Sequence, residues 1–339
     1  MIKTTTSHSG FLSIALVFAQ YFAQLTKARL SFSVVFSSIA GYILGCELID
    51  PNELSLLLFG GLAIAGASNA FNQIIERDID AQMQRTKNRP LPSGNMTQTT
   101  AFWIAVALSI SGLTALYAIN PKTAMFAAIS MFLYTSVYTP LKTKTSLAVF
   151  VGAFPGAIPF MLGWVAATGS FGLEAGTLFM IQFFWQFPHF WAIGWLMFED
   201  YNRAGINMLP SGKRDRKTAL QAVLYSVWTL VISVFPMLGI TGSLQISIAA
   251  AILVALSGLG LLKGRSYSLA ASGPHLLSCG RSSQPLACDE EFLRRPPRKE
   301  SGPFLSIQTL VGSNLHHCIA ITPALILLVV IGSSPFSEA

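Results

Sequence analysis

The sequence predicts an all-α integral membrane protein with about nine transmembrane helices. Of its 339 residues, 52% are hydrophobic and only 11% are charged, and its mean hydropathy is +0.56. Soluble domains carry roughly 25% charged residues. Apolar runs of about 20 residues, the length that a helix needs to cross the hydrocarbon core, recur along most of the chain. We therefore expect a single helical domain in the lipid bilayer.

The apolar runs divide the chain into eight regular spans and a ninth, interrupted one. The eight lie at 30–47, 54–76, 99–119, 122–139, 146–167, 174–198, 218–239 and 243–262. They make up a predicted membrane domain, 30–262, which follows an N-terminal cytoplasmic and interfacial segment, 1–29. The stretch 263–303 is rich in Ser, Gly, Pro and Arg, which indicates a loop or insert. The ninth span lies near 304–333, within a C-terminal segment 304–339.

The positive charges indicate how the spans are oriented. Every one of the 22 Lys and Arg residues except Lys122 falls on the side of the N-terminus and of the loops after spans two, four, six and eight. Such loops stay in the cytoplasm, so we expect a multi-pass protein of the cell inner membrane with its N-terminus inside. The net charge of +7 is thus a topological signal. No basic stripe with interleaved aromatics appears outside the loops, and a nucleic-acid partner is not expected.

The N-terminal segment contains a short apolar stretch. Residues 1–10 are polar and too short for a mitochondrial transit peptide, which favours a bacterial origin. The run 11–19 is similar to the apolar core of a signal peptide. Because Lys27 and Arg29 are followed at once by a long apolar run, we expect instead an interfacial helix that leads into the first span.

The four cysteines show no CxxC pairing, and we expect no disulfide framework. They are Cys46, Cys279, Cys288 and Cys318. A zinc site formed by Cys279 and Cys288 with nearby histidines, which include His275, His316 and His317, is the alternative, and its spacings fit no standard pattern.

Two glycines indicate close helix packing. Gly152 and Gly156 form a GxxxG pair, and Pro155 and Pro159 lie in the same run. This pattern predicts a kinked helix that packs closely on a neighbour. It is ordinary membrane architecture, and we assign it no chemistry.

A polar helix end, NQIIERDIDAQMQRTKNRPLPSG at 72–94, contains the best candidates for a site. Since a helix turns by about 100° per residue, Asn72, Glu76 and Asp80 share one face and Asp78 points away from it. Bases follow at once: Arg85, Lys87 and Arg89. Hard oxygen ligands beside phosphate-binding cations suit a magnesium diphosphate. The alternative is that the acids only form ion pairs in a solvated loop, with Arg77 and Arg85.

Two further helix ends on the cytoplasmic side carry matching groups. Span 174–198 is followed by Glu199, Asp200 and Tyr201, and two acidic helix ends that face one cavity can hold magnesium together with substrate oxygens. In YTPLKTKT, at 138–145, Tyr138 and Lys142 lie four residues apart and reach one phosphate if the helix continues past Pro140. The alternative for Lys142 is simple anchoring of the helix end.

The apolar part of span 174–198 is aromatic around His189. His189 lies about 16 Å along the helix axis from Asp200, so the two cannot bind one ion. An isolated helical histidine is most often a packed, hydrogen-bonded residue. The alternative is that His189 and Trp185 line a cavity and contact an apolar or macrocyclic substrate. The surrounding rings either flank a polyisoprenyl tail and stabilise an allylic cation or face lipid and neighbouring helices.

These motifs resemble the UbiA superfamily of intramembrane prenyltransferases. The run 72–90 is similar to the first aspartate-rich motif of that superfamily, and its form NxxxERDxDxxMxRTxxRPLPSG is similar to the branch that farnesylates protohaem IX. Further similar stretches are LTKARLSF at 25–32, YTPLKTKT at 138–145 and WQFPHFWAIGWLMFEDYNRAGINMLP at 185–210. The resemblance covers about residues 20–262.

The resemblance implies a nine-helix bundle around a central cavity, with Mg2+ as cofactor and farnesyl diphosphate and haem B as substrates. The residues that it implies for the metal are Asn72, Glu76, Asp80 and Asp200. Those that it implies for the diphosphate are Arg85, Arg89, Tyr138 and Lys142. The farnesyl group would pass to a vinyl group of haem, giving haem O, in a site that opens to the cytoplasm. His189 and Trp185 would lie near the haem or the prenyl chain. A haem-modifying enzyme or an oxidase assembly that receives the product is the further partner expected.

Two features depart from the family pattern. Residue 76 is Glu where many relatives carry Asp, and 264–318 do not resemble the family's C-terminal segment, which indicates an insert or a disrupted reading frame. Two alternatives to the haem reaction are a UbiA-type prenylation of an aromatic acceptor such as 4-hydroxybenzoate, and a cation-coupled transporter. Transporters place their acids near the bilayer midplane in repeated halves. Here the acids lie at helix ends and no internal repeat is seen.

Overall fold

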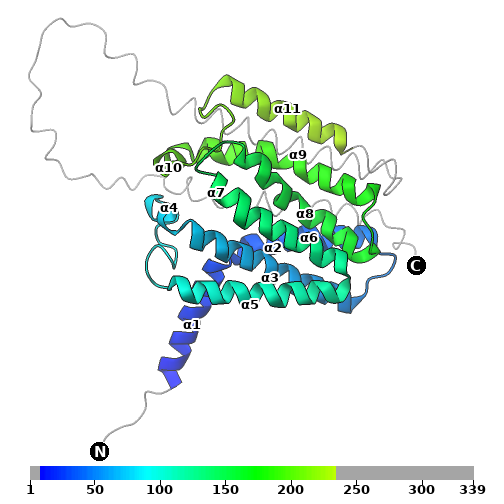
Figure 1. Cartoon of the computed structure of the whole chain (residues 1–339), viewed down its shortest axis with the longest axis horizontal. Coiled ribbons are helices and arrows are strands. Elements are labelled where there is room, and N and C mark those ends of the chain that lie inside the picture. The colour runs from blue at the N-terminus through cyan, green and yellow to red at the C-terminus, as the bar shows by residue number, and fades with distance from the viewer. Residues whose placement is uncertain (1–7, 234–339) are drawn as a thin grey trace, which may run out of the picture.

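The long helices of this chain lie side by side in one bundle (Figure 1). The structure is a computed structural model and describes residues 8–233. Within these residues, five segments are long and apolar enough to cross a membrane. They are Ala28–Gly45 (α2), Pro51–Ile75 (α3), Gln98–Ile119 (α5), Pro121–Leu141 and Ala148–Thr168 (α8). This architecture agrees with the predicted class.

The span Pro121–Leu141 consists of α6 (Pro121–Phe132), η1 (Leu133–Tyr138) and α7 (Thr139–Leu141). The other helices are shorter or less apolar than these five spans: α1 (His8–Leu25), α4 (Arg77–Gln82), α9 (Leu173–Leu196), α10 (Phe198–Arg203) and α11 (Arg216–Ile232). The helices overlap the first seven predicted spans. The end of span 218–239, the spans 243–262 and 304–333, the stretch 263–303 and the proposed cysteine and histidine cluster lie outside the described residues.

Polar residues set where several helices begin. Asp50 accepts a hydrogen bond from the Asn52 backbone at 2.8 Å at the start of α3. Asn120 does the same for Thr123 at 2.9 Å at the start of α6, and Thr97 for Thr100 at 3.1 Å at the start of α5. A proline follows each of the first two caps, where its missing N–H costs nothing. The caps at Asp50 and Asn120 explain why the turns before α3 and α6 are short.

Helix α8 lies at the centre of the bundle and packs against α2, α6 and α9. Helices α2 and α8 approach so closely that a β-carbon at Gly163 would overlap the Ser38 carbonyl oxygen, and one at Gly41 would overlap the Phe160 carbonyl oxygen. Small residues allow such backbone contact in membrane helices. Outside this centre, α3 packs on α2 and α5, and α9 packs on α11.

The predicted close packing at Gly152 and Gly156 is confirmed, but the neighbours are side chains. A β-carbon at Gly152 would lie 2.6 Å from the Tyr138 ring, and one at Gly156 would lie 2.7 Å from the Gln186 amide. The sequence pattern therefore found two tight positions and missed the backbone contact at Gly163. Helix α8 continues through both of its prolines. Because Pro159 has no backbone N–H, it cannot donate the helical hydrogen bond to the Pro155 carbonyl. The hydroxyl of Ser130 donates to that carbonyl instead, at 3.3 Å.

The short helices gather at one end of the bundle. Helices α4, α7 and α10 lie at the same end in Figure 1, and α1 projects away from the bundle. Because each short helix continues a long one, this end collects the polar termini of α3, α6 and α9. The candidate site lies here.

Candidate active site

A cavity of about 120 Å³ lies at this polar end and contains seven of the predicted site residues. Its lining combines basic and acidic side chains with apolar ones. It consists of Lys27, Asn72, Glu76, Asp80, Met83, Arg85, Arg89, Tyr138, Lys142, Phe190, Ile193, Tyr201, Ile206 and Met208. Residues as far apart in the sequence as Lys27 and Met208 thus line one cavity.

The junction of α3 and α4 places Asn72, Glu76 and Asp80 on this cavity. Although α3 ends at Ile75, the Glu76 amide donates to the Asn72 carbonyl at 2.9 Å and the Asp80 amide to the Glu76 carbonyl at 2.7 Å. The four-residue repeat therefore survives the junction, and the three side chains line one cavity as the spacing predicts. All three residues are buried.

Asp78 behaves differently from its neighbours. Its side chain is 93% exposed and lies 3.7 Å from Arg77. The reading of the acids as a solvated, ion-paired loop therefore describes Asp78 and does not describe Glu76 or Asp80.

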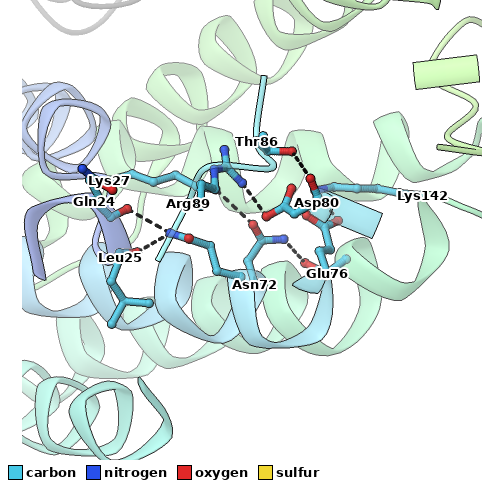
Figure 2. A network of polar contacts seen from close by, with 11 residues as sticks. Gln24, Leu25, Lys27, Asn72, Glu76, Asp80, Thr86, Arg89 and Lys142 are labelled. Carbon is cyan, nitrogen blue, oxygen red and sulfur yellow. Dashed lines mark hydrogen bonds and ion pairs between the residues drawn. The ribbon is translucent and has the colours of Figure 1, made fainter. Parts of the chain in front are cut away.

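Each of these three side chains has one oxygen in contact with a base: Asn72 with Lys27, Glu76 with Lys142 and Asp80 with Arg89 (Figure 2). Lys142 Nζ lies 2.9 Å from Glu76 Oε1 in an ion pair that lacks hydrogen-bond geometry. Arg89 Nη1 donates to Asp80 Oδ2 at 2.7 Å. A buried charge needs such a partner because desolvation is costly.

The loop after α4 brings Arg89 to the cavity. The hydroxyl of the fully buried Thr86 donates to the Asp80 carbonyl at 2.8 Å, and the Thr86 and Lys87 amides both donate to the Met83 carbonyl. These bonds close a tight turn, so that the predicted cation Arg89 faces the acids. Arg85 also lines the cavity, but its side chain is exposed to solvent.

Tyr138 and Lys142 reach the cavity together because the helix continues past Pro140. A π-helical turn, η1, precedes the single turn α7; such turns are rare and occur often at functional sites. Lys142 Nζ lies 4.5 Å from the centre of the Tyr138 ring. Burial acts to lower the pKa of Lys142, but the Glu76 carboxylate outweighs it, and the pKa lies above its ordinary value. Lys144, two residues on, is exposed.

Lys27 is a cavity residue that sequence reasoning missed as a site residue. It stands between α1 and α2, and its Nζ donates to Asn72 Oδ1 at 3.0 Å. Burial, followed by the charges of Arg89 and Lys142, lowers the pKa of Lys27 to about 7. Lys27 could have been predicted as a site residue because it lies directly before an apolar span and within LTKARLSF, a stretch that resembles the family.

Asp200 lies beside the cavity and does not line it. Its Oδ1 accepts the Gln84 backbone N–H at 3.0 Å and lies 3.1 Å from Arg203 Nη1, while the adjacent Tyr201 does line the cavity. Asp200 thus ties α10 to the loop after α4. In the part of the chain that the structure describes, no group of three or more His, Cys, Asp or Glu residues is placed to hold a metal ion. The metal role of Asp200 stays a prediction.

His189 and Trp185 stack on each other, with ring centres 4.6 Å apart and planes within 13°. Helix α9 reaches the cavity through Phe190 and Ile193 instead. The predicted contact of His189 and Trp185 with a substrate therefore stays a prediction.

Most of the other rings on α9 pack into a core between α8, α9 and α11. This cluster includes Phe154, Phe183, Phe187, Trp191 and Tyr225. The rings of this cluster therefore pack against neighbouring helices, which is one of the two roles expected for the aromatic residues around His189. Phe190 is the ring of α9 that lies on the cavity.

Comparison with known proteins gives a consistent result. Residues 34–271 match the UbiA prenyltransferase family. The chain is 64% identical over 241 residues to the Protoheme IX farnesyltransferase of Christiangramia forsetii, covering 71% of this chain and 80% of the relative. It is 62% identical over 254 residues to that of Flavobacterium johnsoniae, covering 74% and 84%.

Solved structures show the same fold at low sequence identity. A UbiA homolog from Archaeoglobus fulgidus bound to GPP and Mg2+ gives a TM-score of 0.62 at 15% identity, covering 91% of this chain and 99% of that one. A structure of digeranylgeranylglyceryl phosphate synthase gives 0.63 at 18% identity, covering 92% and 96%. The predicted all-helical membrane fold is confirmed.

Proposed function

This chain belongs to the UbiA prenyltransferase family, and we propose that it transfers a farnesyl group from farnesyl diphosphate to a vinyl group of haem B, giving haem O. The observation that carries the proposal is the 64% identity over 241 residues to a Protoheme IX farnesyltransferase. Membership in this family argues against a cation-coupled transporter. The cavity supports the proposal because its residues match the chemistry of a diphosphate leaving group.

The cavity fits the diphosphate end of the substrate. Four bases and two acids line it, so an anion is attracted when all are charged. Its volume of about 120 Å³ is smaller than the roughly 300–1,000 Å³ of sites that enclose drug-sized ligands. It therefore suits a polar head group, with the farnesyl chain and the haem extending past its apolar lining residues Phe190 and Ile193.

The oxygens of the cavity fit magnesium. Among the residues that the structure describes, the buried Asp80 Oδ1 has no hydrogen-bond partner, and Glu76 Oε1 has only its ion pair with Lys142. Magnesium is commonly held by one or two carboxylates, with substrate phosphates and water completing the octahedron. Asn72, Glu76 and Asp80 would hold it here. When bound, magnesium neutralises the negative charge that develops on the departing diphosphate.

The residues of this chain act on the same charge. Arg85, Arg89 and Lys142 bind the phosphate oxygens, and these fixed cations stabilise the diphosphate as its bond to the farnesyl carbon breaks. Both bonding electrons leave with the diphosphate. The allylic cation that remains is attacked by the vinyl group of haem, and water then gives a hydroxyl to the resulting cation and releases a proton. The Tyr138 ring, buried beside Lys142, shields the site from bulk water.

We propose that the site opens on the cytoplasmic face of the cell inner membrane. The polar end of the bundle carries Arg85, Lys87, Lys144 and Arg203, and positively charged loops remain on the cytoplasmic side. Farnesyl diphosphate is charged and arrives from water, which agrees with this side. The product would then pass to a haem-modifying enzyme or an oxidase assembly.

The test is to incubate the purified protein with farnesyl diphosphate, haem B and magnesium and to measure farnesylated haem by mass spectrometry. We expect haem O and one diphosphate released per farnesyl group transferred. A protein that prenylates 4-hydroxybenzoate and leaves haem B unchanged would refute the assignment of the acceptor while leaving the family intact.

A further inference from the structure

The side-chain amide of Asn72 is held at both of its ends. Its nitrogen donates to Thr139 Oγ1 at 3.1 Å, and its oxygen accepts from Lys27 Nζ at 3.0 Å (Figure 2). The hydroxyl of Thr139 in turn donates to the Tyr134 carbonyl at 2.8 Å. Asn72 and Thr139 are only 1% and 2% exposed. These contacts form one chain of hydrogen bonds that runs from η1 and α7 to α3 and on to the residue between α1 and α2.

The direction of this chain decides which end of the Asn72 amide faces the cavity. A carbonyl oxygen only accepts hydrogen bonds, and an ammonium group only donates them. Because Thr139 gives its hydroxyl hydrogen to the Tyr134 carbonyl, its oxygen must accept from the amide nitrogen of Asn72. The amide oxygen is then turned toward Lys27, which lines the cavity, whereas Thr139 does not line it. Without the hydroxyl of Thr139, nothing in this chain would distinguish the two orientations of the amide at its buried end.

The π-helical turn η1 brings the Thr139 hydroxyl to Asn72. The Thr139 N–H donates to the Tyr134 carbonyl, five residues back, which is the hydrogen bond of a π-helix. An α-helical bond would end four residues back, so the turn holds one extra residue and rotates the side chains that follow it by about 100°. Helix α3 packs against both η1 and α7. The π-helical turn thus sets which side of this segment faces α3, and the Thr139 hydroxyl lies on that side.

Thr135, one turn earlier, shows the purely structural arrangement of a helical threonine. Its hydroxyl donates to the Met131 carbonyl at 2.8 Å, and such bonds to the preceding turn are common for threonine in a helix. Thr135 is buried like Thr139, and among the described residues it accepts no hydrogen bond from another helix. Thr139 makes the same kind of backbone bond and also accepts a bond from α3. A role within its own helix does not require that second bond.

We propose that Thr139 is a positioning residue that holds the Asn72 amide with its oxygen toward the cavity, as a divalent cation requires. This inference rests on the proposed function, in which Asn72, Glu76 and Asp80 hold magnesium. An amide nitrogen carries two hydrogens and cannot bind a cation, so a reversed amide would remove one ligand. The amide oxygen has two lone pairs and can accept from a lysine and bind a cation together. Outer hydrogen bonds commonly orient the ligands of metal sites in this way.

The experiment measures the binding of farnesyl S-thiolodiphosphate, an analogue that reacts slowly, to the purified full chain in detergent by titration calorimetry. Each protein is titrated with Mg2+ and again with EDTA, which separates the part of the affinity that depends on the metal from the rest. Thr139→Val removes the hydroxyl at similar volume, and Thr139→Ala removes it without placing a second methyl group against α3. Thr139→Ser keeps the hydroxyl. Thr135→Val, which removes the hydroxyl of the structural threonine, is the matched control.

We expect Mg2+ to lower the Kd of the wild type for the analogue. Thr139→Val and Thr139→Ala should raise the Kd measured with Mg2+ by about 10- to 100-fold, the usual effect of losing an outer partner of a metal ligand. The Kd measured with EDTA should change by no more than about twofold. Thr139→Ser and Thr135→Val should bind like the wild type under both conditions. A threonine that only stabilised its helix would alter both values together or neither.

A second comparison removes the need for a fixed amide. Asn72→Asp carries an oxygen at both ends of the group, so either orientation presents a metal ligand. Adding Thr139→Val to Asn72→Asp should therefore change the Kd measured with Mg2+ by about twofold or less. A loss as large as the one that Thr139→Val causes in the otherwise wild-type protein would overturn the proposed role of Thr139.

The remaining outcomes are also decisive. Thr139 has no positioning role if Mg2+ tightens binding by Thr139→Val and Thr139→Ala as strongly as by the wild type, or if the affinity of the wild type does not depend on Mg2+. Equal losses with Mg2+ and with EDTA would overturn the role as well, because they would assign Thr139 to the structure of the whole site. If the wild type and its variants show the expected dependence on Mg2+ while haem B stays unfarnesylated, the role of Thr139 is supported and the proposed function is refuted.

Discussion

Asp80 and Arg89 form an ion pair of 2.7 Å in which the aspartate side chain is only 1% exposed. The second carboxylate oxygen of Asp80 is buried and accepts no hydrogen bond from any residue within 8–233. One oxygen thus fixes the loop after α4, and the other is free to accept a cation. This division of roles explains why the acid at position 80 lies at the centre of the site.

Asp80→Asn should reduce haem farnesylation by about 100-fold or more, because it keeps the shape of the side chain and removes the charge that holds the metal. Product is measured by mass spectrometry at saturating magnesium, and the melting temperature checks that the protein is folded. Asp78→Asn, at an exposed position in the same helix, is the matched control and should retain activity. Near-normal turnover of Asp80→Asn would remove Asp80 from the metal site.

The Glu76–Lys142 pair should show strong coupling in a double-mutant cycle. Glu76→Gln or Lys142→Met alone leaves its partner charged in a site where the two side chains are 7% and 13% exposed, and each should lower the stability by about 3 kcal/mol. The double variant should recover much of that stability, since no charge is left unpaired. Activity should not return, because both groups are needed for the substrate. Additive losses of melting temperature would show that the pair is not coupled in the folded protein.

The sequence predicted the class of fold and most of the charged residues that line the cavity because both follow from local rules. Apolar run lengths located the spans, and the four-residue spacing of Asn72, Glu76 and Asp80 placed them on one face. Lys27 was missed because its approach to Asn72 depends on a turn closed by Gln73, a contact between residues far apart in sequence. Asp200 was expected in the metal site from resemblance, and its actual partners, Gln84 and Arg203, could not be read from spacing.

Gly163→Ala should destabilise the protein by about 1–3 kcal/mol or more, because the new methyl group would overlap the Ser38 carbonyl oxygen and force α2 and α8 apart. Gly176→Ala in α9 is the matched control. In the described part of the chain no atom lies within 4 Å of the position that its β-carbon would take, so the change should be neutral or stabilise the helix by about 0.5–1 kcal/mol. Melting temperatures in one detergent compare the two. Equal effects would mean that α2 and α8 are not in backbone contact at this point.

The first turn of α11 should loosen in acid because Asp215 caps it as a carboxylate. Its Oδ1 accepts the Thr218 backbone N–H at 2.8 Å, and this bond, then that from the Ser211 hydroxyl, holds the pKa of Asp215 below its ordinary value of 3.8. A depressed acid contributes stability that is present above pH 3.8 and is lost as the pH falls through the lower folded pKa. Hydrogen exchange of the α11 amides should therefore accelerate below that pH. Asp215→Asn keeps a neutral cap, so its protection should depend less on pH, whereas Asp215→Ala should lose protection at neutral pH as well. If Asp215→Asn showed the same acid dependence as the wild type, a group other than Asp215 would control the opening of this helix.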